Sequence, residues 1–543
     1  MTSGSLSGEP DAMAGNGTAR AGVFLASLTD IHVPPVLYAS FAGLFTLFMI
    51  VNRFASPKIE DGEPPTLKPT IPFIGHLLGM LRNPTHYMKI LQKKNMPIAT
   101  LPILNGKLYT VWDPLLVQAV FKNKNLSMEP FSLEFSQREL GFGNDFLKLL
   151  QTTTMVHDTF EAMHQAMTST NVRRMNANAL GYISGALDEI RIDKPLEVSN
   201  SYLWVRNLMT LATTQALYGP DNPFRKDDSL LQEIWTFDEG LAWLMFGVAT
   251  TVTARRCYQA RTRLQAVLNK YYEHNKHLHA DAAQITKNRA AALRKHGIPE
   301  NKTGDIEIVL LHVAVTNTIP ALFWFMTQVF THPELVSLLR EEVGPIAQRA
   351  NNNVTIDISE LDETCPLLVS CYRESMRLCN KGLSHRRVLE DTTISDGNGR
   401  SYLLKKGCNV EMSQEVCHSL ERAWGPDWGT FMPDRFVESK PNKLHDEAEK
   451  LRKAAFVPFG GGKHLCPGRN FAFAETMGLM VSLVLGFNVT LLDKEMRPTT
   501  EPVKMDRCTL ISSIVRPVGN GEGLGVKIER REGWEEVKWH YTS

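Results

Sequence analysis

The stretch FVPFGGGKHLCPGRNFAFAE, Phe456–Glu475, holds the most distinctive chemistry of this chain. Its three consecutive glycines, Gly460–Gly462, let a backbone loop pass close to a flat partner that side chains would hold away. Cys466 follows the glycines. Pro467 after it is a favoured first residue of a helix, which the apolar run Phe471–Leu485 would continue. The sequence therefore predicts a cysteine at a helix N-terminus, where the helix dipole and free backbone N–H groups stabilise a thiolate.

A buried free cysteine beside a glycine-rich turn is usually structural, but the whole pattern around Cys466 is far more constrained. The string Phe459-Gly-x-Gly-x-His-x-Cys466-x-Gly resembles the haem-binding loop of the cytochrome P450 superfamily. The resemblance implies that Cys466 is the metal ligand and binds the iron of haem b (iron protoporphyrin IX) as a thiolate, which favours O–O cleavage. The family usually has arginine in place of His464, and histidine keeps a donor for a haem propionate. The cofactor-binding residues implied by this loop are Phe459, Gly460, Gly462, His464, Cys466 and Gly468.

Two further motifs precede the cysteine in the order that the family requires. Glu374 and Arg377 have the i, i+3 spacing of an ordinary surface pair on a helix. Phe431–Phe436, FMPDRF, is similar to the family's Phe-x-Pro-x-Arg-Phe element. In the family this arginine joins the helix pair, so the resemblance implies a buried triad of Glu374, Arg377 and Arg435 that is structural rather than catalytic. A carboxylate between two arginines leaves donors over, which backbone carbonyls must accept.

The apolar segment that ends at Thr331–His332 resembles the family's central helix, which lies over the haem. Counted back from there, Val313–Thr318, VAVTNT, occupies the place of the usual Ala-Gly-x-Asp/Glu-Thr-Thr. Thr316 therefore replaces the acidic residue, and Asn317 replaces the alcohol tied to proton delivery. We expect Asn317, with Thr316 and Thr318 beside it, to be catalytic, because a carboxamide offers a donor and an acceptor that hold water or bound oxygen.

The residues after Asn317 narrow the resemblance. Asn-Thr-x-Pro followed by Phe323 and Trp324 resembles the branch that contains the sterol 7α- and 12α-hydroxylases and prostacyclin synthase. Pro320 inside a helix removes one backbone hydrogen bond and kinks the helix, which would open a groove above the iron. The alternative is that Asn317 and Pro320 are ordinary helix irregularities. The branch implies a bulky apolar substrate such as a sterol, a terpenoid or another lipid-like secondary metabolite.

Arg386 is the residue that we expect to bind one haem propionate, because the family has a basic residue just before the strand region that starts at Asp391. His385 and Arg387 flank it, so the assignment could shift by one residue. The family also commonly has a Trp-x-x-x-Arg element on an earlier helix for the second propionate. Residues 130–180 contain no such element, so the second propionate partner stays unassigned.

The patterning of the chain indicates a protein that is mainly α with a small β-region, as the cytochrome P450 fold is. Helical periodicity extends over Leu230–Phe246, Tyr258–His279 and Asp305–Phe330. Asp396–Gly399, DGNG, predicts a hairpin turn. The net charge of +1, from 59 basic and 58 acidic residues, indicates no nucleic-acid partner. Eight cysteines without paired spacing favour a reducing compartment.

The N-terminal region contains a candidate membrane anchor. Residues 33–51, VPPVLYASFAGLFTLFMIV, carry no charge and are long enough to span a bilayer as a transmembrane helix. Arg53 and Lys58 follow closely, so the positive-inside rule places the rest of the chain in the cytosol and residues 1–32 in the lumen as a tail. Asn16 would then be a candidate glycosylation site. The alternatives are a cleaved signal peptide, for which the expected basic stretch and cleavage site are unclear, and a buried core helix.

Two regions are expected after the anchor. Residues 52–72 are rich in proline and predict an extended linker that holds the protein at a fixed distance from the bilayer. No later linker or repeat divides the chain, so residues 73–543 are expected to be one haem-thiolate catalytic domain. The resemblance covers about residues 73–531, and the residues from Glu532 onward look like a polar tail.

The resemblance implies a monooxygenase of the endoplasmic reticulum membrane. It would insert one atom of O₂ into its substrate with electrons from NADPH through NADPH–cytochrome P450 reductase, and cytochrome b5 is a further candidate partner. One alternative is a haem-thiolate isomerase or dehydratase that needs no reductase, and another is a non-enzymatic haem or sterol sensor. Other catalytic motifs fail: Gly460–Lys463 lacks the spacing of a P-loop, and the chain has no His-Glu-x-x-His zinc motif.

Overall fold

The computed structural model describes residues 38–46, 57–69, 74–104, 106–437, 443–501, 503–506 and 512–543. The chain forms two compact units, Met1–Pro57 and Lys58–Ser543. Within the predicted transmembrane helix 33–51, residues 38–46 are helical and their side chains are exposed. The rest of that segment, and the tail 1–32 with Asn16, lie outside the described residues.

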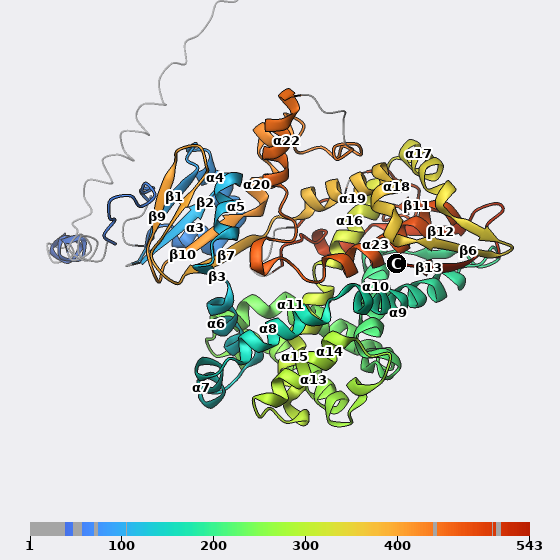
Figure 1. Cartoon of the computed structure of the whole chain (residues 1–543), viewed down its shortest axis with the longest axis horizontal. Coiled ribbons are helices and arrows are strands. Elements are labelled where there is room, and N and C mark those ends of the chain that lie inside the picture. The colour runs from blue at the N-terminus through green and yellow to red at the C-terminus, as the bar shows by residue number, and fades with distance from the viewer. Residues whose placement is uncertain are drawn as a thin grey trace, which may run out of the picture. The chain divides into compact units, whose positions relative to one another are not determined.

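The larger unit is mostly helical, as the periodicity predicts (Figure 1). The predicted segment that begins at Leu230 is α11, and the one that begins at Tyr258 lies in α13, which ends at Glu273 because Asn275 leaves the helical conformation with φ 54°. The helices that build the unit are α3 (Leu77–Arg82), α4 (Pro84–Gln92), α5 (Pro114–Lys122), α6 (Glu129–Leu140), α7 (Asn144–Thr152), α8 (Met155–Ala166), α9 (Ser169–Asp188), α10 (Ser201–Tyr218), α11 (Asp228–Phe246), α13 (Arg255–Glu273), α14 (Gln284–Lys295), α15 (Glu300–Val315), α16 (Thr318–Phe330), α17 (Pro333–Val343), α19 (Pro366–Cys379), α20 (Gln414–His418), α22 (Lys443–Ala455) and α23 (Arg469–Gly486).

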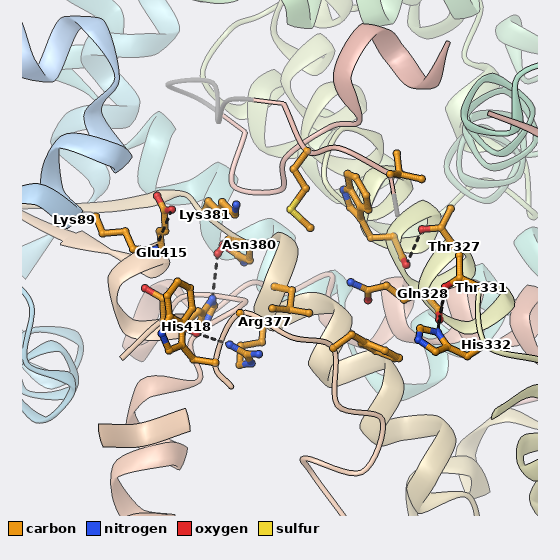
Figure 2. A pocket seen from close by; sticks show the side chains of 18 residues that line it. Lys89, Thr327, Gln328, Thr331, His332, Arg377, Asn380, Lys381, Glu415 and His418 are labelled. Atoms are coloured by element: carbon orange, nitrogen blue, oxygen red, sulfur yellow. Dashed lines mark hydrogen bonds and ion pairs between the residues drawn. The ribbon is translucent and has the colours of Figure 1, made fainter. Parts of the chain in front are cut away.

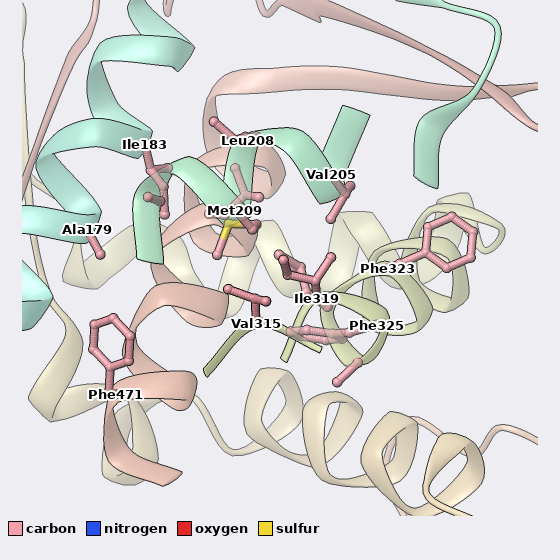
Figure 3. Packing of buried hydrophobic residues seen from close by; sticks show 14 of the residues in the cluster. Ala179, Ile183, Val205, Leu208, Met209, Val315, Ile319, Phe323, Phe325 and Phe471 are labelled. Atoms are coloured by element: carbon pink, nitrogen blue, oxygen red, sulfur yellow. The ribbon is translucent and has the colours of Figure 1, made fainter. Parts of the chain in front are cut away.

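The core lies where α9, α10, α16 and α23 meet (Figure 3). α16 and α23 are apolar on nearly all sides, because each is surrounded by protein and neither has a solvent face. In Figure 3, Ile319 of α16 lies next to Met209 of α10, and Phe471 of α23 lies on the Ala179 side of the cluster. Among the described residues, one helical stretch is long and apolar enough to cross a membrane, Glu300–Phe330, and most of it is buried in this core.

Small sheets complete the unit. The five-stranded sheet has the order β1-β2-β10-β7-β3, and in it Arg386 of β7 lies opposite Val410 of β10. The predicted hairpin is confirmed, because β8 and β9 pair across a turn in which Gly397 and Gly399 have positive φ. The strands are β1 (Ile98–Ile103), β2 (Gly106–Val111), β3 (Leu126–Ser127), β4 (Leu196–Val198), β5 (Gln348–Ala350), β6 (Asn353–Asp357), β7 (Leu383–Val388), β8 (Thr392–Ser395), β9 (Ser401–Leu404), β10 (Asn409–Ser413), β11 (Phe487–Leu492), β12 (Gly525–Arg530) and β13 (Lys538–Thr542).

The long apolar helix predicted to start at Asp305 is interrupted where Pro320 predicts. α15 ends at Val315, two residues form a turn, and α16 begins at Thr318. Pro320 has no N–H group, so the carbonyl of Thr316 loses its ordinary i+4 partner. The interruption therefore lies at the two positions where the sequence departs from the family pattern.

The C-terminal residues form a strand, so the prediction of a polar tail from Glu532 is wrong. β13 pairs in parallel with β6 in a three-stranded sheet. Trp539 is 2% exposed and stacks on Phe487 and Trp534. A Cβ at Gly486 would lie 2.4 Å from the Trp539 ring. The composition of this segment is polar, but the segment forms a strand whose side chains alternate between two faces. Trp539 lies on the buried face.

The described part of the proline-rich segment, residues 57–69, contains no helix, but it turns at 61–63 and packs against the β-region instead of standing apart from it. The N–H of Thr100 in β1 donates to the carbonyl of Pro65 at 2.9 Å, and the N–H of Leu67 donates to Thr100 at 3.0 Å. The buried carboxylate of Glu63 accepts from Lys107 at 2.7 Å. This part of the segment is therefore an edge of the sheet region.

Candidate active site

The cysteine loop, Phe459–Gly468, is the first part of the site. The N–H of Cys466 donates to the carbonyl of Phe459 at 3.1 Å, and the half-buried thiol forms no disulfide. α23 begins at Arg469, so Cys466 lies three residues before the helix. Burial raises the pKa of the Cys466 thiol, whereas hydrogen bonds from the backbone at Gly468 and Arg469 lower this pKa. The raised pKa leaves the thiol neutral, so a bound cation is needed to hold it as a thiolate.

Two of the three glycines are required by α5. A Cβ at Gly462, whose φ is +64°, would lie 1.8 Å from the backbone oxygen of Phe121. A Cβ at Gly461 would lie 2.3 Å from the ring of the same residue. At Gly460, by contrast, a Cβ would meet no atom nearer than 3.8 Å. Gly461 and Gly462 thus hold the loop against the helix, and Gly460 borders open space.

Arg386 is a buried cation beside this loop. Its side chain, in β7, donates to the carbonyls of His385 at 2.7 Å and Gly461 at 3.3 Å, and it stacks over the Phe121 ring. Arg386 is 3% exposed, and burial lowers its pKa to about 10. It forms no ion pair with any carboxylate of the described residues. A buried guanidinium without an acid is a site for an anion.

The residues on either side of Arg386 have partners of their own. His385 lies 3.5 Å from Glu411, and Arg387 pairs with Glu134 at 3.1 Å. Alternate residues of a strand face opposite sides, so only the central one of the three points towards the loop. Of the three residues, Arg386 is therefore the one that contacts the loop, and its binding of a propionate stays a prediction.

His464 is held by α6 at the opposite side of the loop. Its Nε2 accepts from the backbone N–H of Met128 at 3.2 Å. Burial, followed by the charge of Arg386, lowers the pKa of His464 to about 4. The imidazole is therefore neutral at physiological pH, and its proton lies on Nδ1, where it remains a hydrogen-bond donor.

The triad residues meet around one carboxylate. Arg377 donates to Glu374 at 2.7 and 2.8 Å, and Arg435 donates to the same group at 2.9 Å. The remaining donors bind backbone carbonyls, at 2.6 Å from Arg377 to His418 and 2.6 Å from Arg435 to Trp424. Arg435 also pairs with Asp427 at 3.2 Å, so backbone carbonyls and a second carboxylate together accept the donors that Glu374 leaves over.

A cavity of about 280 Å³ lies beside the triad, between α16 and α19. Figure 2 shows Arg377 and His418 on one side of it and Gln328 of α16 on the other. None of Thr316, Asn317, Thr318 or Cys466 lines this cavity. The triad therefore belongs to the structural wall of a separate space.

The distal segment has one open face. Val313 is 52% exposed although it lies on a helix between buried neighbours, and Ala314, Asn317 and Thr318 are half-buried. These positions recur at i, i+1, i+4 and i+5, so they lie on one side of the helix. The distal segment therefore has one accessible face, with Val313 the most exposed of these residues.

The polar groups of the distal segment have partners that the sequence did not indicate. The carboxamide oxygen of Asn317 accepts from the backbone N–H groups of Ser513 at 3.0 Å and Ile514 at 3.2 Å. Its acceptor is therefore occupied, and its NH₂ group is the part left for a water or ligand. Thr316 is buried and its hydroxyl donates to the carbonyl of His312 at 2.9 Å, so it turns back onto its own helix. Thr318 forms no side-chain hydrogen bond among the described residues.

Comparison with known proteins shows which family the chain belongs to. The family model for cytochrome P450 matches residues 64–512, most of the chain. The chain belongs to the cytochrome P450 family. A cytochrome P450 monooxygenase of Gibberella zeae is 42% identical over 92% of this chain and 94% of its own length. This chain is accordingly an enzyme of the cytochrome P450 monooxygenase family.

More distant cytochrome P450 relatives confirm the branch and the fold. The human 7-alpha-hydroxycholest-4-en-3-one 12-alpha-hydroxylase is 23% identical over 80% of this chain and 87% of its own length, so the resemblance to sterol hydroxylases is confirmed. A cyanobacterial cytochrome P450, CYP120A1, solved with retinoic acid bound, superposes with a TM-score of 0.63 at 18% identity, over 87% of this chain and 100% of the other. The mainly α cytochrome P450 fold is thereby confirmed.

Cytochromes P450 bind haem, and the residues of this site fit that group. A haem supplies an iron cation for a buried thiol and two carboxylates for buried donors. Cys466 offers the thiol, Arg386 the unpaired cation and His464 a neutral donor. The iron thus has a candidate ligand in Cys466, and the propionates have candidate hydrogen-bond donors in Arg386 and His464.

His164 is a candidate for the second propionate that sequence reasoning missed. Phe160 and His164 of α8 have the spacing of the family's Trp-x-x-x-Arg element, with both residue types changed. His164 lies close enough to His464 for its charge to lower the pKa of that imidazole. A search for the spacing with any aromatic and any basic residue would have found this pair.

Proposed function

We propose that this cytochrome P450 is a haem-thiolate monooxygenase that inserts one oxygen atom from O₂ into a bulky, mostly apolar substrate. The observation that carries the proposal is the thiol of Cys466, half-buried with a raised pKa, beside a buried cation that lacks an acid. The buried cation needs an anion, the thiol needs a bound cation to ionise, and an iron porphyrin supplies both. When bound, haem supplies the activation of O₂ and thiolate ligation favours O–O cleavage.

The residues around the cofactor have distinct roles in this proposal. Cys466 would ligate the iron, and Arg386, His464 and His164 would bind the propionates. Gly460 and Gly468 leave room for the porphyrin plane, since a Cβ at either would meet nothing nearer than 3.8 Å. These groups hold and orient the cofactor, so a change in any of them should alter haem retention before it alters substrate choice.

The distal segment supplies the groups for oxygen and protons. The NH₂ group of Asn317 is the donor left over after its oxygen binds Ser513 and Ile514. An amide does not ionise at physiological pH, so Asn317 orients water rather than releasing a proton itself. Thr318 has an uncommitted hydroxyl half-buried on the same face. Protons would therefore arrive along water that these two residues orient.

The proposed substrate is a sterol, a terpenoid or another lipid-like secondary metabolite. The support comes from Val313 and Ala314, which present small apolar surfaces on the open face of α15. The similarity to sterol hydroxylases points in the same direction. Apolar side chains at this face suit an apolar ring system, because burial of apolar surface supplies binding free energy.

The proposed partners are NADPH–cytochrome P450 reductase, with cytochrome b5 as a further electron donor, and the endoplasmic reticulum membrane. The support is the family and the apolar segment 33–51. Because residues 1–57 form a unit of their own, deletion of residues 1–56 should release the protein from membranes and leave haem binding intact. Sedimentation with membranes and the haem spectrum measure the two results. Loss of the haem spectrum on deletion would contradict the anchor assignment.

The decisive experiment is expression of the full chain with a reductase, followed by spectroscopy and product analysis. The reduced protein with carbon monoxide should absorb at the long wavelength typical of thiolate ligation. Mass spectrometry of products from a panel of sterols and terpenoids should then find a substrate that gains one oxygen atom with NADPH consumed. Product without NADPH consumption would instead favour the isomerase or dehydratase.

A further inference from the structure

His312 of α15 lies one turn before the helix interruption, and its side chain contacts α11 through Asp238 and Phe237. Its carbonyl accepts from the N–H and the hydroxyl of Thr316, so the imidazole is fixed relative to the distal segment. The side chain is 5% exposed and packs edge-on against Phe237. Burial lowers the pKa of His312, so the imidazole is neutral. A neutral imidazole has one donor and one acceptor, and the two nitrogens must be assigned.

The contact with Asp238 of α11 determines which nitrogen of His312 carries the proton. Its carboxylate lies 2.6 Å from the Nε2 of His312, pairs with the guanidinium of Arg516, and accepts from the hydroxyl of Ser512 at 3.4 Å. Beside a guanidinium the carboxylate is ionised and only accepts hydrogen bonds, so Nε2 of His312 carries the proton. The Nδ1 of His312 is therefore an acceptor.

That acceptor has no hydrogen bond among the described residues. The Oε1 of Glu139, at the end of α6, lies 3.7 Å from it, beyond hydrogen-bond distance. The Glu139 carboxyl makes no hydrogen bond to any described side chain or backbone group. Burial raises the pKa of Glu139, yet 13% of its side chain remains accessible, so a bound molecule can reach it.

Glu139 and His312 thus present a donor and an acceptor with a gap between them. Burial favours the protonated form of the Glu139 carboxyl, in which it can donate a hydrogen bond, and Nδ1 of His312 can accept one. An alcohol needs both, because its oxygen accepts one hydrogen bond and its O–H donates another. If the pair served only to join α6 to α15, direct contact between the two groups would be expected, whereas 3.7 Å leaves both unsatisfied.

We propose that Glu139 and His312 bind a hydroxyl group of the substrate, with Asp238 and Arg516 as positioning residues that fix the histidine tautomer. The proposal rests on the proposed function, because the ligand is the substrate of that same site, and it narrows the substrate class to an oxygenated sterol or terpenoid. The hydroxyl donates to Nδ1 of His312 and accepts from the carboxyl of Glu139. The apolar body of the substrate is then held at one defined orientation.

The experiment measures dissociation constants of the full-length holoenzyme from the shift of its haem absorption. The probes are matched pairs, 5α-cholestan-3β-ol against 5α-cholestane and a series of steroid and diterpene alcohols against their deoxy hydrocarbons. A satisfied polar pair predicts that, in at least one matched pair, the alcohol binds about tenfold tighter or more. Glu139→Leu and His312→Phe should reduce the affinity for that alcohol to the level of the hydrocarbon and leave the hydrocarbon's affinity unchanged.

Two further variants separate recognition from stability. Glu139→Gln keeps a donor of similar size and should retain most of the preference for the alcohol. Glu161→Leu, on the exposed face of α8, is the control and should change neither constant. The carbon monoxide band of every variant reports whether the haem-thiolate site is intact, independently of the probes. Wild-type protein that shows the band but no preference for any alcohol overturns this proposal and leaves the monooxygenase assignment standing. An equal loss of affinity for both members of a pair in Glu139→Leu also overturns it.

Discussion

The cysteine loop and the distal segment differ in how their residues are fixed. In the loop, each key residue is determined by contact with the backbone or by an unmet charge: Gly462 has no room for a side chain beside α5, and Arg386 has no acid. In the distal segment, the polar groups of Thr316 and Asn317 already bind the protein's own backbone. The difference shows that a motif governed by backbone geometry transfers between relatives residue by residue. A motif governed by side-chain chemistry must be checked against the partners that each side chain has.

The largest effect is expected from Cys466→Ala, which tests the loop side of the comparison most directly. Without the thiolate, the reduced protein should lose the long-wavelength carbon monoxide band and all monooxygenase activity. Cys408→Ala, which removes the other half-buried cysteine of the described residues, should change neither. The comparison breaks if the Cys466 variant keeps the band, since another cysteine would then be the ligand.

Arg386→Leu should give the next largest effect. Loss of charge-assisted hydrogen bonds to a propionate weakens haem affinity by about tenfold or more, measured as the rate of haem transfer to apomyoglobin. The haem-free variant should be more stable than the haem-free parent, because leucine removes an unpaired buried cation. Arg387→Leu, whose charge pairs with Glu134 at the surface, is the matched control and should leave haem affinity close to that of the parent. Unchanged haem transfer in Arg386→Leu would mean that the guanidinium is structural.

Asn317→Ala tests the role of the distal segment, because its effects on stability and on coupling can be measured separately. Loss of the acceptor for Ser513 and Ile514 should lower the free energy of unfolding by about 1–3 kcal/mol. Loss of the NH₂ donor should reduce product formed per NADPH and increase peroxide release. Asn317→Asp restores the acceptor but not the donor, so it should recover stability and keep the coupling defect. A variant that recovers both would show that Asn317 acts only through the backbone of the 513–514 segment.

Thr316→Val should have the smallest effect. The hydroxyl donates to the carbonyl of its own helix, and valine fills nearly the same volume, so the free energy of unfolding should change by less than about 1 kcal/mol. Coupling of NADPH to product should stay within error of the parent. A clear coupling defect here would place Thr316 in the proton path after all and would remove the contrast between the two regions.

The sequence was sufficient for the parts of the fold that are encoded locally. Pro320 located the helix interruption, and Asp396–Gly399 located the hairpin, because both act within a few residues of themselves. The partners of Asn317 lie almost two hundred residues away, and nothing in the local pattern indicates them. The strand at Lys538–Thr542 was missed for a related reason, since its polar composition describes one face and its burial depends on Gly486.

The chain segment 512–516 connects two otherwise separate parts of the site. Its backbone holds the carboxamide of Asn317, and its side chains Ser512 and Arg516 hold Asp238. The segment therefore contacts both the helix interruption, through Asn317, and the partner of His312, through Asp238. A ligand large enough to displace this segment would move Asn317 and Asp238 together. The size of the ligand would then change the arrangement of the polar groups that face oxygen. Tight binding and efficient turnover would then respond to ligand size together.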